Sequence, residues 1–371
     1  MTRGCWRGRL VSNLVIIGLV CSTQLPAQEP ALPAATPDVH LDDNARTAFI
    51  RGAQLWSPTD ISSLDLKAGP PGAGAFQPNE LVTCEYVETK LHGSTRKFAC
   101  ALAPGHVMKV RYGAHNREVH ASVVATRLLW ALGFGADRAY PVQVRCIGCS
   151  SDPWNRPQRV KGDHLFAPAV IEQRPDGYAM TDDRGSAGWS WSELDLVDER
   201  AGGASLAQKD ALKLLAVFMQ HTDTKREQQR MWCLPGGLDA AGHCVKPYLM
   251  LHDVGLTFGH ANAFNASGSG SIDLDKWAST PIWKDAHACV GHLRKSITGT
   301  LENPRISEAG RSFLANLLLQ LTDQQLNDLF DVAGVGRDAD SDNASSDSRI
   351  GQWVAAFKHK RDEIVLARCP Q

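Results

Sequence analysis

Apolar residues in the first half of the chain follow two different periods. Segments rich in β-branched and aromatic residues predict strands, and one longer segment repeats its apolar positions at helical spacing. The predicted order is three strands, a helix that Gly133 ends, and two more strands. The strands cover 81–88, 98–104, 106–113, 140–146 and 167–173, and the helix covers 117–134.

The second half of the chain has mainly helical periodicity. Ser307 and Thr322 are placed to cap two of its helices. A polar stretch at 337–349 predicts a loop. The predicted elements are the helix 208–221, the hairpin 231–244, the strand 248–259, two helices within 307–330 and a final helix at 352–366.

The N-terminus has the three-part plan of a secretory signal peptide. Basic, acid-free MTRGCWRGRL precedes the short apolar core VSNLVIIGLV, and small Ala27 follows. We therefore predict a signal peptide at 1–27, a flexible leader and N-terminal extension at 28–78, and an exported product, periplasmic or secreted. A lipid anchor at Cys21 is the alternative, although a bulky residue precedes it. The apolar core is short for a membrane span, so we expect no transmembrane span in the mature chain.

Composition excludes one class of partner. The chain of 371 residues has 39 basic and 40 acidic side chains, so no basic field favours nucleic acid. Removal of the predicted signal peptide leaves 36 basic against 40 acidic residues. With 43% hydrophobic and 21% charged residues, the composition is that of a globular protein, long enough for one large core or two lobes.

Export changes the meaning of the cysteines. Two of the ten lie in the signal region, and the even number that remains suits disulfides in an oxidising compartment. The sequence does not fix their pairing, and C-x-x-C is also open to a thioredoxin-like redox site or half of a zinc site. The local-pairing hypothesis is Cys84–Cys100, Cys146–Cys149 and Cys233–Cys244, which leaves Cys289–Cys369 as a long-range pair.

Lys109 lies inside the apolar segment VMKVRY. A lysine there is costly to bury unless it is paired or faces a cleft. Glu118 opens the following predicted helix and is placed to reach back, so we expect a Lys109–Glu118 ion pair. The alternative is a surface lysine on an edge strand and a glutamate favoured by the helix N-terminus.

HTDTKREQ at 221–228 concentrates polar side chains directly after an apolar helix. Asp223, Lys225 and Gln228 place a carboxylate, an ammonium and an amide close together, so they are candidate site residues. Asp253, in Asp-Val-Gly after an apolar run, is a second carboxylate for a metal. The alternatives are the polar end of a helix, where His and Lys are favoured anyway, and ordinary turn chemistry.

In this order the motifs resemble the protein-kinase-like superfamily. The resemblance covers about residues 80–335 and is strongest to the atypical branch of HipA-type, phosphatidylinositol-kinase-type and secretory-pathway kinases. It implies an α+β, two-lobed protein-kinase-like fold, with a small β-rich lobe containing one helix at 79–173 and a larger, mainly helical lobe at 174–371. The segment REVHASVVATRLLWALGFGADRAYPV also resembles a group of exported bacterial proteins.

The resemblance implies ATP and Mg²⁺, or Mn²⁺, bound between the lobes. The turn GSTRK, with Arg96 and Lys97, would cover the phosphates, and Glu172 would approach the adenine edge. Lys109 with Glu118 would position the phosphates. The turn contains no G-x-G-x-x-G, and no A-P-E sequence ends the segment after Asp-Val-Gly, where GHANAFNASGSGS follows instead.

The same resemblance gives roles to the two later motifs. Asp223 and Lys225 would be catalytic, and Gln228 and Asp253 would hold the metal, with Gln228 standing where kinases have asparagine. The first hypothesis is therefore an exported phosphotransferase that uses Mg-ATP on a hydroxyl acceptor of a protein, lipid or glycan. The alternatives are a pseudokinase that acts as a binding or scaffold module, and nucleotidyl transfer on the same fold.

Overall fold

The computed structural model describes residues 38–91, 93, 95–155, 160–259, 271–335 and 346–370. All of them belong to the unit Leu32–Gln371. The predicted signal peptide at 1–27 lies outside the described residues, as does the part of the predicted leader before Asp38.

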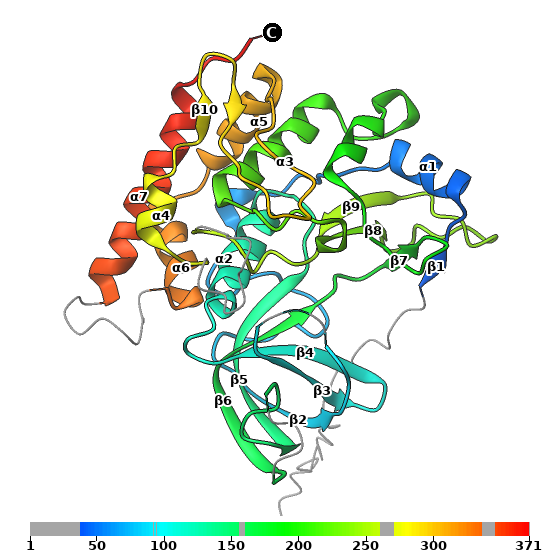
Figure 1. Ribbon diagram of the computed structural model, residues 1–371, viewed down its shortest axis with the longest axis vertical. Helices are drawn as coiled ribbons and strands as arrows, with labels where there is room; N and C mark the ends of the chain where they lie inside the picture. The colour runs from blue at the N-terminus through cyan, green and yellow to red at the C-terminus, as the bar shows by residue number, and fades with distance from the viewer. Residues whose placement is uncertain are drawn as a thin grey trace, which may run out of the picture. The chain divides into compact units, whose positions relative to one another are not determined.

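Five strands of the first half close into a barrel, with the order β2-β3-β4-β6-β5 (Figure 1). One helix, α2, lies between the third and fourth of these strands in the sequence, which confirms the predicted order of three strands, a helix and two strands. The elements are β2 (Leu81–Val87), β3 (Lys97–Ala103), β4 (His106–Tyr112), α2 (Glu118–Ala131), β5 (Arg138–Cys149) and β6 (Gly162–Gln173).

Strands β5 and β6 are longer than the sequence predicts because the C-x-x-C segment is itself part of a strand. Cys146 pairs with His164 and Cys149 with Gly162, with a shift of register between the two pairs. The segment therefore opens no helix. Alternate side chains of the five strands fill the barrel, among them Val110, Tyr140 and Val144, none of which is exposed.

A second sheet has the order β1-β7-β8-β9. A hairpin forms with other bounds than predicted: β8 and β9 pair in antiparallel fashion, the second strand lies beyond residue 244, and the Cys233–Cys244 disulfide closes the connection. The apolar run predicted as a strand to residue 259 leaves the sheet after Leu251. The strands are β1 (Val39–His40), β7 (Tyr178–Thr181), β8 (Gln229–Cys233) and β9 (Pro247–Leu251), and a separate two-stranded sheet joins β10 (Trp283–Asp285) to β11 (Val290–Gly291).

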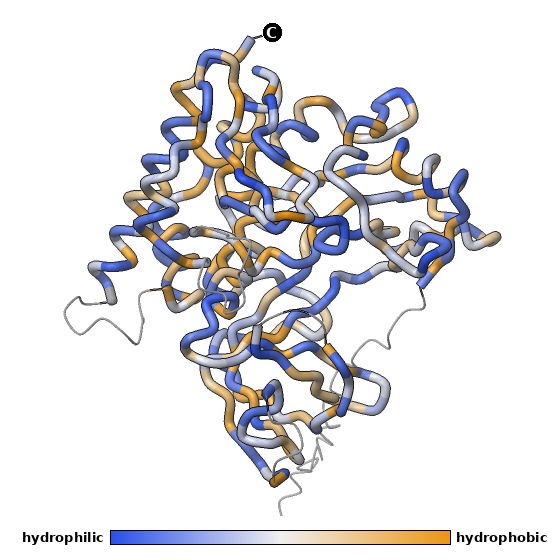
Figure 2. Tube along the Cα trace, viewed as in Figure 1, coloured by the Kyte–Doolittle hydropathy of each residue, from blue (hydrophilic) through white to orange (hydrophobic). Residues whose placement is uncertain are grey.

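The remaining helices contribute to one large apolar cluster, and a second cluster fills the barrel. Figure 2 marks the hydrophobic and hydrophilic positions along the chain. Ser307 and Thr322 cap their helices as the sequence predicts, each accepting a hydrogen bond from a backbone N–H three residues ahead. The last helix begins at Ser346, so the end of the predicted 337–349 loop is helical. The helices are α1 (Asp43–Arg51), α3 (Leu206–Met219), α4 (Leu274–Ser279), α5 (Glu308–Leu318), α6 (Asp323–Ala333) and α7 (Ser346–Leu366), with 3₁₀ turns η1 (Ile61–Ser63), η2 (Trp191–Leu196), η3 (Glu199–Ala201) and η4 (Arg226–Gln228).

The predicted N-terminal extension is built into the fold from Val39 onwards. Val39 pairs with Met180 in a parallel bridge of the second sheet, and Ile50 and Leu55 are fully buried in the large cluster. Removal of this segment would expose that core, so it is an integral part of the fold rather than a tether.

All four disulfides of the local-pairing hypothesis are present. Two of them meet inside the barrel, where the sulfur atoms of Cys100 and Cys146 lie 3.9 Å apart. Within the part of the chain that the structure describes, no helix combines the length and the apolar character that a bilayer crossing requires.

Candidate functional site

Arg111 is the centre of a buried ionic cluster on strand β4. Its guanidinium donates through Nε to Glu172 and through Nη1 to Glu118, and Nη2 lies 2.7 Å from Asp253 Oδ2. Nη1 also donates to Thr95 Oγ1 at 3.1 Å. The planar guanidinium presents its N–H groups in a fixed fork, which is why one arginine can serve carboxylates from three elements.

The expected Lys109–Glu118 ion pair is not formed. Lys109 pairs with Glu172 on the neighbouring strand β6, and Glu118 pairs with Arg111. The reason is the geometry of the strand: Lys109 and Arg111 face the same side, but Arg111 lies two residues, about 7 Å, closer to the end where α2 begins. Arg111 therefore takes the position that the sequence analysis gave to Lys109.

Burial and ion pairing compete at each carboxylate of the cluster. Burial raises the pKa of the Asp253 carboxyl, but Arg111 and Lys109 outweigh it and hold that pKa well below its usual range. Burial also raises the pKa of Glu172, but the same two cations outweigh it, so the pKa of Glu172 is lowered. At Glu118 burial prevails over Arg111, so its pKa is raised.

The two cations of the GSTRK turn are placed differently. Lys97 is 6% exposed, pairs in register with Arg111, and has its Nζ 5.5 Å from the centre of the Trp154 ring. Burial, reinforced by the charge of Arg111, lowers the pKa of Lys97 to about 8. Arg96 is exposed and its side chain runs beside Gly113, away from the cluster. Ser94 of the turn lies outside the described residues.

The predicted catalytic loop begins where α3 ends. Gln220 adopts a left-handed conformation with φ of 53°, which stops the helix, and His221 follows with no exposed surface. Both ring nitrogens of His221 lack a partner among the described residues, and burial lowers its pKa to about 4. His221 is thus a neutral, buried residue beneath the loop.

Asp223 is held through both of its carboxylate oxygens. Oδ2 accepts hydrogen bonds from Gln228 Nε2 at 2.7 Å and from Lys225 Nζ at 3.1 Å. Oδ1 accepts one from Ser296 Oγ at 3.4 Å. The side chain of Asp223 is 11% exposed, so it is largely shielded from solvent.

Gln228 joins the two candidate metal-binding motifs. Its side chain donates to Asp223, and its backbone carbonyl accepts from the N–H groups of His252 at 2.8 Å and Asp253 at 3.3 Å. The tertiary structure therefore brings together Asp223, Lys225, Gln228 and Asp253, which lie up to thirty residues apart in the sequence.

His252 completes the surroundings of Asp253. Its Nδ1 lies 2.5 Å from Asp137 Oδ2, and Arg230 Nη2 lies 2.7 Å from its Nε2. An arginine donates only, so Nε2 accepts and Nδ1 carries the proton that is given to Asp137. Burial lowers the pKa of His252, in keeping with this neutral form.

Sequence reasoning missed three residues of the site: Arg111, Thr95 and Ser296. A signal for Arg111 was present, because Lys-x-Arg places two cations on one face of a strand. Thr95 lies in the predicted GSTRK turn, but only the two cations of that turn were given a role. Ser296 follows Asp223 by 73 residues, and no local pattern connects them.

Sequence comparison identifies no relatives: no protein-family model matches the chain, and no curated protein matches it. Two solved structures show a distant likeness. The Helicobacter pylori proinflammatory kinase CtkA is 9% identical with a TM-score of 0.40, and the match covers 77% of this chain and 97% of that one. A Golgi casein kinase with Mn/ADP bound is 10% identical with a TM-score of 0.33, over 77% of this chain and 73% of that one. At these TM-scores neither likeness carries an argument, and a function must be inferred from the site itself.

Proposed function

We propose that this protein is an exported kinase-like phosphotransferase that uses Mg-ATP on a hydroxyl acceptor. The observation that carries the proposal is the double role of Gln228, which binds Asp223 through its side chain and Asp253 through its backbone carbonyl. Gln228 thereby links the carboxylate that we propose for the acceptor's proton to the backbone of Asp253, whose carboxylate we propose for a metal, and phosphoryl transfer needs both groups.

The oxygen atoms of the site fit Mg²⁺ or Mn²⁺ in kind. Carboxylates of Asp223 and Asp253 and the amide oxygen of Gln228 are hard donors. Among the described residues no group of three or more His, Cys, Asp or Glu gathers to hold a metal, so the ion would rely on the nucleotide's phosphates for its other ligands. The metal, when bound, would neutralise charge on those phosphates.

The predicted residues keep their roles in this proposal, except that Arg111 takes the phosphate-binding role predicted for Lys109. Asp223 would accept the proton of the acceptor hydroxyl, and Lys225, which is 36% exposed, would face the transferring group. Arg111 would bind phosphate in place of the lysine, with Glu118 orienting it. Lys97 and Arg96 remain candidates for binding the phosphates of ATP. Glu172 remains a candidate for contacting the adenine ring, although it forms ion pairs with Lys109 and Arg111.

We further propose that residues 79–173 and 174–371 form the two lobes of a kinase-like fold with the nucleotide between them. The closed barrel with its single helix and the mainly helical remainder support this division. Export is supported by the four disulfides, since such bonds persist in oxidising compartments.

The test is thermal unfolding of the exported, oxidised chain with and without Mg-ATP. A ligand that binds only the native state stabilises it by about 2.7 kcal/mol at a hundredfold excess over Kd. We expect a rise of the midpoint in the wild type and in Asp195→Asn, whose side chain is 77% exposed, and no rise in Asp253→Asn. Equal rises in all three proteins, or none in any of them, would refute the proposal.

One observation favours the second candidate, a pseudokinase that acts as a binding module. Arg111 donates to Oδ2 of Asp253, an oxygen that a metal would need. The three carboxylates of the cluster (Glu118, Glu172 and Asp253) are balanced by three cations (Lys97, Lys109 and Arg111), so the cluster is neutral without a metal. Nucleotide binding that does not depend on Mg²⁺ and is not followed by ADP release would favour the pseudokinase over the phosphotransferase.

A further inference from the structure

The segment 296–301 is fixed against the catalytic loop by backbone hydrogen bonds. Ser296 N donates to Thr222 O at 2.9 Å, and Thr300 N donates to Thr224 O at 3.1 Å. The hydroxyl of Thr224 also accepts hydrogen bonds, from the N–H groups of Thr300 and Leu301 at 3.1 Å each. These contacts are made by backbone atoms of the segment, so they do not depend on its side chains.

The backbone bonds place one hydroxyl on the proposed general base. Asp223 Oδ2 is already engaged by Gln228 and Lys225, whereas Oδ1 faces Ser296 Oγ at 3.4 Å. A hydroxyl that is to be phosphorylated must lie within hydrogen-bond reach of the base that takes its proton. Ser296 thus stands where an acceptor hydroxyl would stand.

We infer that Ser296 is a phosphorylation site of this protein and the first acceptor of its own active site. The inference rests on the proposed function and names ATP as the phosphoryl donor. Ser296 Oγ forms a bond to the γ-phosphorus while the bond from that phosphorus to the β–γ bridging oxygen breaks. ADP leaves with the electron pair of the broken bond, and the proton of Oγ passes to Asp223 Oδ1.

The surroundings of Ser296 favour the product. Arg294 and Lys295 precede Ser296 and are exposed, and Lys295 Nζ lies 3.9 Å from Glu302. Lys225 forms an ion pair with Asp223, the same carboxylate that Ser296 contacts. A phosphoserine carries close to two negative charges at neutral pH, which these cations attract and the Asp223 carboxylate repels. The modified side chain therefore leaves the base and opens it to an external hydroxyl.

The test is incubation of the exported, oxidised chain with Mg-ATP, followed by peptide mass spectrometry. We expect one phosphate on Ser296 in the wild type, none on this segment in Ser296→Ala, and an unchanged phosphate in Thr298→Ala, an exposed hydroxyl two residues away. In Asp223→Asn the initial rate should fall about a hundredfold or more, the usual contribution of a general base. The rate per molecule should not depend on protein concentration, because donor site and acceptor share one chain.

Parallel thermal unfolding separates the two levels of failure. A Mg-ATP shift without phosphate on Ser296 overturns the inference and leaves the proposed function standing. No shift in the folded wild type overturns the proposed function and the inference with it. If Ser296 only positions Asp223, Ser296→Ala will lower ATP consumption while wild-type Ser296 stays unmodified, which also overturns the inference.

Discussion

Arg111 Nη2 donates to Asp253 Oδ2 across 2.7 Å, so one ion pair links strand β4 to the loop that follows β9. The same guanidinium also binds Glu118 at the start of α2 and Glu172 on β6. Four elements thus meet at one side chain, which is 1% exposed. The ion pairs of Arg111 therefore connect the barrel, α2 and the loop after β9 at the candidate site.

Replacement of Arg111 by methionine should strongly destabilise the protein. Removing one member of a buried ion cluster typically costs about 3–5 kcal/mol, because the remaining charges are left uncompensated. Urea denaturation measures the free energy of unfolding. The matched variant Lys109→Met should lose less, since Lys109 is 24% exposed and its direct ion pair among the described residues is with Glu172. Equal losses in both variants would show that Arg111 is not the centre of the cluster.

Gln228→Ala should separate catalysis from folding. The variant loses the 2.7 Å hydrogen bond to Asp223 and keeps the backbone carbonyl that binds His252 and Asp253. We expect slower ATP consumption with a change in unfolding free energy of about 1 kcal/mol, the usual contribution of one such bond. Glu227→Ala, an exposed neighbour, is the control. Wild-type turnover in Gln228→Ala would remove Gln228 from the site.

Lys97 should make stability depend on alkaline pH. Burial lowers the pKa of Lys97 in the folded protein to about 8, below the 10.5 of an ordinary lysine. The unfolded chain therefore binds more protons between these values, and the free energy of unfolding should rise as the pH rises from about 8 towards 10.5. Lys97→Met should flatten this rise in urea titrations across the range, whereas exposed Lys90→Met should not. An unchanged slope in Lys97→Met would contradict the assignment.

A long-range and a local disulfide should differ in their contribution to stability. Cys289–Cys369 closes 80 residues and Cys233–Cys244 closes 11. Loop-closure entropy predicts losses of about 4.5 and about 3 kcal/mol, respectively, when each pair is replaced by alanines. Comparison of the two double variants by urea denaturation checks the order. A larger loss at Cys233–Cys244 would mean that native contacts, rather than chain entropy, decide.

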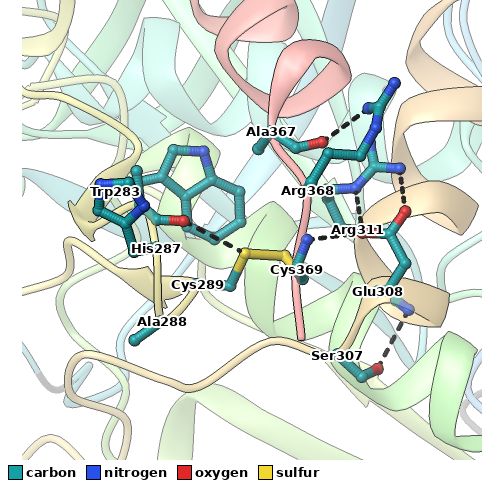
Figure 3. The surroundings of a disulfide bond; sticks show 12 residues. Trp283, His287, Ala288, Cys289, Ser307, Glu308, Arg311, Ala367, Arg368 and Cys369 are labelled. Carbon is teal, nitrogen blue, oxygen red and sulfur yellow. Dashed lines mark hydrogen bonds and ion pairs between the residues drawn. A yellow bond between two sulfur atoms is a disulfide. The ribbon is translucent and has the colours of Figure 1, made fainter. Parts of the chain in front are cut away.

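Glu308 ties the C-terminal end of the chain to α5 beside the Cys289–Cys369 disulfide (Figure 3). Its Oε2 accepts from Cys369 N and from Arg311 Nε, both at 2.8 Å. Hydrogen bonding from Arg311 lowers the pKa of Glu308 to about 2, from the usual 4.5. Its stabilising effect is therefore complete above pH 4.5 and is lost as the pH falls towards 2.

Glu308→Gln should accordingly lose stability at neutral pH and be less sensitive to acid than the wild type. Unfolding midpoints measured between neutral pH and acid provide the comparison. Glu199→Gln, at an exposed position, should follow the wild-type profile. Parallel profiles for Glu308→Gln and the wild type would show that the carboxylate does not titrate in this range.

Much of the fold follows from local sequence signals. The order of strands and helix in the barrel, the caps at Ser307 and Thr322 and the four disulfides all agree with predictions. Periodicity, capping hydroxyls and the short spacings of three cysteine pairs act locally, which is why they can be recognised without a structure. The pair Cys289–Cys369, 80 residues apart, was predicted only because its two cysteines remained. The residues of HTDTKREQ and Asp253 were recognised in the same way, as local motifs.

The tertiary structure alone decided which side chains meet. The register of β4 against β6 and the start of α2 gave Glu118 to Arg111 rather than to Lys109. The path of the chain after α4 brought Ser296 to Asp223, and the second sheet incorporated Val39 from the predicted leader. Such pairings depend on strand register and on contacts far apart in the sequence, and a shift of one or two residues changes the partner without altering any local pattern.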